Sequence, residues 1–296
     1  MSRVGVLPFI EPQLPTLVGQ PPGGADWFHE VKHDGYRTLL AINRGGAIAY
    51  TRNGYDWTAR YPGIIRAATK LSCKSAMLDG EVIVQDARGA SDFEALQSGL
   101  RTRGAPLIFY AFDLLHLDGR DLRNEPLSER RRKLKNLIKP DPLNVLQFSE
   151  EFAGDGAEFF KACAEHQLEG IVSKLATAPS RSGRTKTWLK TKCFTESELI
   201  LIGIDRDRKT RAPRALLAKS EGPRLQYVGA AFLGLPAAAR DLMSAKLDEL
   251  TADAPSIPWL RNREARWVQP RLKVTVRHLA GPGLLRHASV TDICGA

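Results

Sequence analysis

Metal-binding and disulfide patterns are missing from this 296-residue sequence. Its four cysteines (Cys73, Cys163, Cys193 and Cys294) show no C-x-x-C spacing, which argues against a zinc ribbon and against a disulfide framework. The six histidines are equally dispersed, and none is paired at the spacing of metal ligands. These absences exclude the small zinc-bound and disulfide-rich classes of protein.

Long apolar runs are also missing. No stretch approaches the roughly 20 apolar residues of a transmembrane helix, and the N-terminal MSRVGVLPFIEP has too short an apolar core for a secretory signal. We therefore expect a cytoplasmic location and no membrane partner. The sequence also lacks internal repeats, and its composition is that of a soluble globular protein. It shows no sign of oligomerisation, so we expect a monomer.

Positive charge is in excess along the whole chain. The net charge is +10 and the pI is near 9.6. Residues 1–193 contain 27 Lys/Arg against 22 Asp/Glu, and residues 194–296 contain 16 against 11, so each part contributes +5. Such an excess favours an acidic partner, most often nucleic acid. A basic protein that is merely soluble is the alternative.

The first two thirds of the sequence mix strand and helix patterns. Residues 1–24 are rich in proline and glycine and predict an extended arm. A break at Asp79-Gly80 separates two of the predicted strands, and the charged run ERRRKLK of the first helix is expected to face solvent. Strands are predicted at Arg37–Asn43, Ala47–Thr51, Ala76–Leu78, Glu81–Gln85 and Leu107–Leu117, and helices at 126–138 and 156–167.

The pattern changes after Cys193. Short strands follow one another, with one amphipathic helix near Ala237–Leu250. About five short strands carrying one helix fit the barrel of an OB-fold. We therefore predict an α+β protein with two domains. Residues 1–193 form antiparallel sheets with flanking helices, and residues 194–296 form an all-β OB-fold domain.

An ordered set of motifs carries the functional signal. Lys32 stands at the end of an apolar strand-like run, in the K-x-D-G-x-R pattern of KHDGYR. The motifs that follow are TRNG from Thr51, LDGEV from Leu78, FYAFDLLHLDGR from Phe109, EGIVSK from Glu169 and WLKTK from Trp188. K-x-D-G-x-R alone is weak evidence, but the ordered set is specific. It resembles the covalent nucleotidyltransferases, specifically ATP-dependent DNA ligases, and is most similar to the ligase module of bacterial end-joining ligases and their stand-alone relatives.

The resemblance implies a nucleotidyltransferase (adenylation) domain ahead of the OB domain, with Lys32 as the catalytic nucleophile. Lys32 would attack the α-phosphate of ATP and carry AMP as a phosphoramidate. An amine attacks only when deprotonated, and a lysine with an ordinary pKa of about 10 is almost wholly protonated at neutral pH. Burial, neighbouring cations and a bound metal each lower that pKa. Lys190 and Lys192, two apart on a strand, should point to one face and supply positive charge.

Further contacts with the nucleotide follow from the resemblance. Arg37 and Arg52 are the expected partners of phosphate and ribose, because a guanidinium binds oxyanions bidentately. Glu81 is assigned to the ribose hydroxyls and, together with Glu169, to a divalent metal, Mg²⁺ or Mn²⁺. Surface salt bridges remain the alternative for the two arginines, and a hairpin charge remains the alternative for Glu81.

Phe112 and Glu30 are expected at the adenine base. Strand alternation puts Phe112 and Tyr110 on one face and Phe109 and Asp113 on the other. The family stacks an aromatic side chain of this motif on adenine, and Phe112 is the better match, although an aromatic in a buried strand is ordinarily core. Glu30 stands where the family reads the edge of the adenine, partly through backbone.

Two basic loops are candidate DNA contacts. Both would bind phosphates without reading sequence, which suits an enzyme that acts on any nick. OB-folds commonly contact nucleic acid at the loop between their first two strands. Solvated loops are the alternative for both. The candidates are Arg181, Arg184 and Lys186 in the first loop, and Arg206, Arg208, Lys209 and Arg211 in the second.

The resemblance fails at the last motif. The family's OB domain normally ends in an Arg-x-Asp-Lys segment, which orients the pyrophosphate of ATP in the first step. Here Cys294 falls about where the arginine is expected, and the lysine is missing. We therefore expect weakened self-adenylation, with Arg277 or Arg286 as candidate substitutes. Sealing of an already adenylated nick should survive.

Together these patterns predict an ATP-dependent DNA ligase of DNA repair that seals 3′-hydroxyl/5′-phosphate nicks in duplex DNA through a lysyl-AMP intermediate. A role beside end-joining or other repair proteins rests on analogy with the family. Two alternatives stay open. One is an RNA ligase or an mRNA-capping guanylyltransferase, which share the lysine motif and the fold. The other is a non-catalytic nick-binding relative that has lost its last motif.

Overall fold

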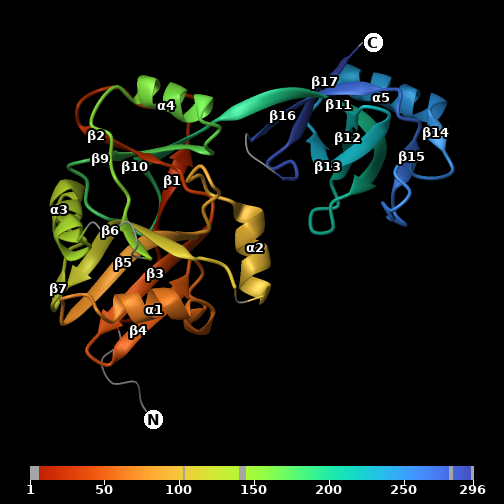
Figure 1. Ribbon diagram of the computed structural model, residues 1–296. Coiled ribbons are helices and arrows are strands. Elements are labelled where there is room, and N and C mark those ends of the chain that lie inside the picture. Colours follow the sequence, from red (N-terminus) through yellow and green to blue (C-terminus); the bar gives the residue numbers. More distant parts are fainter. Residues whose placement is uncertain (1–6, 103, 140–144, 280–282, 295–296) are drawn as a thin grey trace. The chain divides into compact units, whose positions relative to one another are not determined.

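The chain forms two compact units, Met1–Cys193 and Phe194–Ala296, in the computed structural model (Figure 1). The structure describes residues 7–102, 104–139, 145–279 and 283–294. In the described residues the first unit has two sheets and the second has one, and each unit has its own buried core. Within the described residues, no helix has both the length and the apolar character needed to cross a bilayer.

A four-stranded sheet in the first unit brings together segments from both ends of that unit. Its strand order is β1 (Gln13–Leu17), β10 (Gly183–Lys192), β9 (Gly170–Leu175) and β2 (Trp27–Val31). β1 pairs parallel with β10, and the other two pairs are antiparallel. The proline-rich arm predicted from the sequence therefore contributes an edge strand to this sheet.

A six-stranded sheet lies between these segments in the sequence. Its path is β4–β3–β5–β6–β7, with β8 parallel to β6. The predicted hairpin at 37–51 and the predicted long buried strand at 107–117 are both confirmed. The strands are β3 (Tyr36–Asn43), β4 (Gly46–Thr51), β5 (Ser75–Ile83), β6 (Ile108–Leu117), β7 (Arg120–Asp121) and β8 (Leu146–Phe148).

Strand β5 runs through Asp79-Gly80 without interruption, so the predicted break there is wrong. A Cβ added at Gly80 would overlap the ring of Phe109 and lie 2.5 Å from the carbonyl oxygen of Tyr110. The carboxylate of Asp79 instead binds Arg37 on the neighbouring strand. Asp-Gly is typical of a turn when only the local sequence is considered. Here close packing requires the glycine and an ion pair uses the aspartate, so the dipeptide lies inside a strand.

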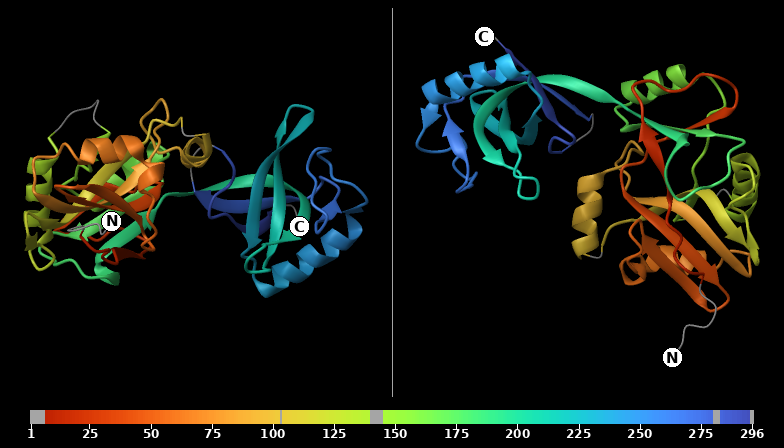
Figure 2. Two further views of the ribbon diagram at one scale, coloured as in Figure 1. Left: turned by 90° about the horizontal axis from the view of Figure 1, so that it is seen from below. Right: turned by 180° about the vertical axis from the view of Figure 1, so that it is seen from behind.

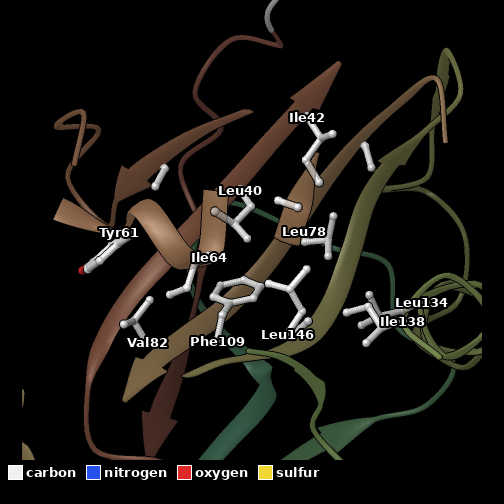
Figure 3. Close-up of a cluster of buried hydrophobic side chains, with 14 of the residues drawn as sticks. Leu40, Ile42, Tyr61, Ile64, Leu78, Val82, Phe109, Leu134, Ile138 and Leu146 are labelled. Atoms are coloured by element: carbon white, nitrogen blue, oxygen red, sulfur yellow. The ribbon is translucent and has the colours of Figure 1, made fainter. Parts of the chain in front are cut away.

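Helices pack on the six-stranded sheet to form the main core of the first unit. Figure 3 shows Leu40, Leu78 and Phe109 of the sheet meeting Ile64 of α1 and Leu134 of α3. α4 instead packs against β9 and β2 of the other sheet (Figure 1). The helices predicted at 126–138 and 156–167 are confirmed as α3 and α4. The helical segments are η1 (Thr58–Arg60), α1 (Pro62–Ala68), α2 (Phe93–Thr102), α3 (Leu127–Leu137) and α4 (Gly156–Glu165).

The charged run on α3 is not a solvated face throughout. Arg130 and Arg131 are buried, at 0% and 2% exposure, whereas Arg132 is exposed. The prediction from the sequence is therefore wrong for the first two arginines. Helical periodicity carried the signal that was missed, because both arginines fall on the stripe between Leu127 and Leu134 that packs on the sheet.

The second unit is a closed barrel. Strand pairing runs β11–β12–β13–β17–β16 and returns to β11, with β13 and β17 parallel and the other pairs antiparallel. Figure 2 shows α5 (Ala237–Glu249) lying along the barrel, and Met243 of α5 enters the core. The predicted OB-fold is confirmed. Its strands are β11 (Phe194–Arg206), β12 (Pro213–Glu221), β13 (Arg224–Leu233), β16 (Lys273–Leu279) and β17 (Ser289–Cys294). Short β15 (Arg266–Val268) pairs with β11, and short β14 (Thr251–Ala252) pairs with β15.

Candidate nucleotide site and basic cleft

A cavity of about 190 Å³ in the first unit is lined by residues from both of its sheets. We call it the intersheet cavity. It collects most of the residues that the sequence predicts for the nucleotide, although their motifs are spread over 160 residues of chain. The predicted members that line it are Glu30, Lys32, Arg37, Arg52, Glu81, Phe112 and Lys190.

Cross-strand register builds one wall of the intersheet cavity. Side chains alternate along a strand, so every second residue of β2, β9 and β10 faces the same side. Lys32 follows β2 directly, and its backbone N–H donates to the Gly170 carbonyl at 2.9 Å. The aligned rows across the three strands are Phe28–Lys174–Trp188 and Glu30–Val172–Lys190.

Three lysines gather around one buried carboxylate. Lys32 Nζ pairs with Glu169 Oε2, and Lys192 Nζ lies 3.8 Å from Glu169 Oε1. Burial lowers the pKa of Lys190, and the charges of Lys192 and Lys32 lower it further. Burial also lowers the pKa of Lys192, against the opposing effect of Glu169. The arrangement therefore concentrates positive charge at the end of β2, where an anionic group can compensate it.

The opposite wall comes from β3, β5 and β6. Arg37 and Glu81 are cross-strand neighbours, and both line the intersheet cavity. The guanidinium of Arg37 is held by Asp79, with Nε–Oδ1 at 2.5 Å and Nη2–Oδ2 at 2.7 Å. Burial raises the pKa of Glu81 to about 7, although Arg37 and Lys32 oppose the shift. Arg52 reaches the cavity from an exposed position on the turn after β4.

A β-bulge in β6 presents Phe112 to the intersheet cavity. The pairing of β5 with β6 shifts register between Asp79 and Gly80, which leaves Phe112 as an extra residue. The strict alternation predicted from the sequence therefore does not continue through this strand. Phe112 lines the cavity, whereas Tyr110 stacks on His33 at 4.3 Å between ring centroids. Of the two aromatic residues, only Phe112 is among the described lining residues of the cavity, and there Arg37 and Lys174 lie over its ring at 4.5 Å and 4.1 Å from the centroid.

A buried charge network holds Glu30. Its Oε1 accepts a hydrogen bond from Arg131 Nη1 at 2.9 Å and lies 2.7 Å from Lys174 Nζ, and its Oε2 accepts from Ser149 Oγ at 2.9 Å. Arg131 Nη1 also donates to the carbonyl oxygen of Phe112 at 2.8 Å. One guanidinium therefore fixes the side chain of Glu30 and the backbone of Phe112 together.

Lys174 is a site residue that the sequence prediction missed. It is 2% exposed, it lines the intersheet cavity, and its Nζ lies 4.1 Å and 4.3 Å from the ring centroids of Phe112 and Trp188. Burial lowers the pKa of Lys174 to about 8, with Glu30 opposing the shift. Its place in EGIVSK, two residues after Val172 on the same strand face, was the available signal.

The carboxylates present suit a magnesium-like ion whose remaining ligands come from the substrate. They do not suit an ion that is coordinated by protein side chains alone. No group of three or more His, Cys, Asp or Glu side chains able to hold a metal occurs among the residues that the structure describes. Glu81 and Glu169 are close enough for the charge of Glu169 to raise the pKa of Glu81. Mg²⁺ is usually bound through one or two carboxylates together with substrate phosphates and water. Mn²⁺ suits the same oxygen ligands.

The residues predicted for DNA fall in two places. Arg184 and Lys186 lie on β10, Arg181 lies two residues before that strand begins, and none of the three lines the intersheet cavity. In the second unit, the predicted loop residues line a cleft of about 920 Å³, which we call the basic cleft. The prediction did not include Arg214 at the end of the same loop, and it missed Arg261 and Arg263 because they come from a loop some 50 residues further on. The cationic residues of the basic cleft are Arg206, Arg208, Lys209, Arg211, Arg214, Arg261 and Arg263.

The C-terminal position expected to hold an arginine is part of the barrel. Cys294 on β17 lies opposite Lys273 of β16, and its Sγ is 3.3 Å from Thr275 Oγ1. Arg277 lies over the ring of Phe194 at 4.1 Å. Burial lowers the pKa of Arg286. Their proposed substitution for the missing motif stays a prediction.

Comparison with known proteins adds independent information. Residues 19–192 match the family model described as ATP dependent DNA ligase domain. The multifunctional non-homologous end joining protein LigD of Pseudomonas aeruginosa is 32% identical over 95% of this chain and 35% of its own length. LigD of Mycobacterium tuberculosis is 32% identical over 86% of this chain and 34% of its own length. The chain thus spans about a third of these curated relatives.

Solved structures agree with the sequence matches. The ligase domain from M. tuberculosis LigD has a TM-score of 0.54 and 27% identity, and the match covers 95% of this chain and 94% of that one. The structure of mycobacterial DNA ligase D complexed with ATP and MES has a TM-score of 0.55 and 26% identity, with the same coverage.

Proposed function

The chain belongs to the ATP-dependent DNA ligase family, and from that premise we propose that it seals 3′-hydroxyl/5′-phosphate nicks in duplex DNA through a lysyl-AMP intermediate. Residues 1–193 act as the adenylation domain and residues 194–296 as its OB domain. The observation that carries the proposal is the convergence of Lys32, Glu169, Lys190 and Lys192 beside the intersheet cavity.

Lys32 is the nucleophile of the first step. Its Nζ forms a bond to the α-phosphorus of ATP, the bond from that phosphorus to the bridging oxygen breaks, and pyrophosphate leaves. Lys190 and Lys192 lie beside Lys32 and offer positive charge to the phosphate oxygens. Mg²⁺ or Mn²⁺, when held by Glu81 and Glu169, supplies charge that neutralises the transferring phosphoryl group.

The remaining lining residues suit the rest of the nucleotide. Phe112 and Val172 come from opposite walls and offer apolar surface to the faces of an adenine ring. The carboxylate of Glu30 can accept a hydrogen bond from the exocyclic amino group. Arg37 and Arg52 supply positive charge for ribose and phosphate. We assign adenylate binding to these residues together with Glu81.

Two further transfers complete the reaction. AMP passes from Lys32 to the 5′-phosphate of the nick, and attack by the 3′-hydroxyl then expels AMP and seals the strand. Arg181, Arg184 and Lys186 and the cations of the basic cleft hold DNA phosphates without reading sequence. The relatives named above are end-joining proteins, which supports a role in repair beside such partners. The chain itself is proposed to act as a monomer.

Incubation with α-labelled ATP and Mg²⁺ or Mn²⁺ tests the nucleophile. Label should stay on the wild-type chain and be lost in Lys32→Ala, while Lys161→Ala on the exposed face of α4 should keep it. α-Labelled GTP in place of ATP tests the capping-type alternative, and retention of GMP would contradict the proposal.

Sealing of a pre-adenylated nick, run in parallel, tests the later steps. Sealing without labelling would show that the altered C-terminal motif has removed the first step alone. If the chain shows neither labelling nor sealing, the non-catalytic nick-binding relative is favoured instead.

A further inference from the structure

An exposed tryptophan stands at the edge of the basic cleft. Trp259 is 68% exposed, the highest value among the large hydrophobic side chains that the structure describes. It lies in a turn closed by a hydrogen bond from Leu260 N–H to the Ile257 carbonyl at 3.0 Å. Ile257 is buried in a small core with Trp267. An anchored turn therefore holds the indole in solvent.

The indole is continuous with the lining of the basic cleft. Trp259 meets Tyr227 edge to face, with ring centroids 6.3 Å apart and an interplanar angle of 84°. Tyr227 lines the cleft, and so does Leu260, the residue after Trp259. The edge contact with Tyr227 fixes the orientation of the indole and leaves most of its surface open.

The acidic side chains of the basic cleft are already engaged. Asp205 accepts two hydrogen bonds from Arg214, at 3.0 Å and 2.8 Å, and Glu264 pairs with Arg211 at 3.1 Å. Asp207 accepts from two backbone N–H groups of its own loop. Five exposed cations in the cleft have no carboxylate within ion-pair distance in the described parts of the chain: Arg206, Arg208, Lys209, Arg261 and Arg263.

We propose that the basic cleft and Trp259 together bind an unpaired strand of nucleic acid, with phosphates along the free cations and one base stacked on the indole. In a duplex the bases are stacked on one another and offer no open face to a side chain, whereas an unpaired base does. Phosphate contacts alone would explain the cations but would leave the exposed indole without a role. The inference rests on the proposed function, because a protein that joins DNA strands meets unpaired flanks and overhangs on its substrates.

Binding of the full chain to two matched DNAs tests the proposal. Both carry the same nick, and one also carries a ten-nucleotide single-stranded overhang of thymidines. Trp259→Ala should weaken binding of the overhang DNA by roughly 5- to 150-fold, the usual range for loss of one base–aromatic stack. It should leave the blunt nicked DNA unchanged. Trp259→Phe should retain most of the difference between the two DNAs, because a ring remains.

The cations give a second and separate measurement. Arg261→Ala with Arg263→Ala should lower the salt dependence of binding to a single-stranded oligonucleotide by about 1.4 in the log–log slope, at about 0.7 per phosphate contact. Arg224→Ala is the matched control, since Arg224 is exposed in the same unit and does not line the cleft. Tyr55→Ala is the control for loss of an exposed aromatic, at 67% exposure in the first unit.

The outcomes separate this inference from the proposed function. Equal effects of Trp259→Ala on both DNAs, or no effect on either, would overturn it. Binding of an acidic peptide in the cleft with no binding of single strands would also overturn it, in favour of a protein partner. Labelling of Lys32 by ATP should be unchanged in Trp259→Ala. Absence of labelling in the wild-type chain would count against the proposed function, but not against binding of an unpaired strand in the basic cleft.

Discussion

Substitution of Arg131 by methionine is the sharpest test of the buried network. Methionine fills a similar volume but cannot donate hydrogen bonds. Glu30, at 2% exposure, would lose the 2.9 Å bond from Nη1, and the carbonyl oxygen of Ser149 would lose a 2.6 Å bond from Nη2. The carbonyl oxygen of Phe112 would also lose its donor. Buried acceptors left without donors are costly.

The magnitude follows from burial and from the partners that remain. Removing one member of a buried ion pair costs about 3–5 kcal/mol. Lys174 and Ser149 still contact Glu30, so we expect the lower end, about 3 kcal/mol. That is a large share of the 5–15 kcal/mol that is typical of a folded domain. Arg132→Met on the same helix should cost about 0.5 kcal/mol or less, because Arg132 and its partner Glu129 are 62% and 47% exposed.

Urea unfolding of the full chain measures the difference between these two variants. The free energy of unfolding of Arg131→Met should fall well below that of Arg132→Met. The fraction that remains folded should also label Lys32 with ATP less efficiently, because the backbone of Phe112 is no longer held. A destabilisation within about 0.5 kcal/mol of the Arg132→Met value would refute the reasoning.

Two further predictions concern the walls of the intersheet cavity. Glu81→Gln should raise the free energy of unfolding at pH 8 by up to about 3 kcal/mol, because burial raises the pKa of Glu81 to about 7 from an ordinary 4.5. The protonated carboxyl stabilises the fold below pH 4.5 and this contribution is lost as pH rises through 7, so a pH-independent gain in urea unfolding would contradict the prediction. Gly80→Ala should cost about 1–3 kcal/mol through overlap with Phe109 and the Tyr110 carbonyl. Gly63→Ala on α1 should raise the midpoint of thermal unfolding, because alanine favours a helix more than glycine and nothing lies within 4 Å of the added Cβ. Equal midpoints for Gly80→Ala and Gly63→Ala would refute this account.

Local patterns in the sequence were enough to predict much of the fold. The glycine-centred hairpin, the apolar strand at 108–117 and the periodic helix at 127–137 each depend on neighbours in the chain, and each prediction is confirmed. The strand through Gly80 was predicted wrongly, because the glycine is required by close packing against Phe109 on another strand and not by a turn. The arm strand β1 was missed because its partner, β10, lies some 170 residues away.

In the candidate site too, residues that belong to local motifs were predicted, whereas residues that depend on distant contacts were missed. The motifs predicted Lys32, Phe112 and Lys190, and all three line the intersheet cavity. Arg131 was missed because its partner Glu30 is 101 residues away and no spacing in the sequence connects them. Arg261 and Arg263 were missed because a basic cleft is a property of the folded barrel, where two distant loops meet.

The way the four-stranded sheet is assembled has a consequence for how the protein reaches its native state. β1 and β2 lie within the first 31 residues, whereas their partners β10 and β9 lie at 170–192. The six-stranded sheet, mostly built from strands close together in the sequence, falls entirely between them. Contacts that close long loops form late, because the loop entropy is lost before the contacts stabilise the chain. We therefore expect the lysine end of β2 to meet Glu169 only in the last stage of folding of the first unit, so that a folding intermediate would hold a formed core and no adenylation chemistry.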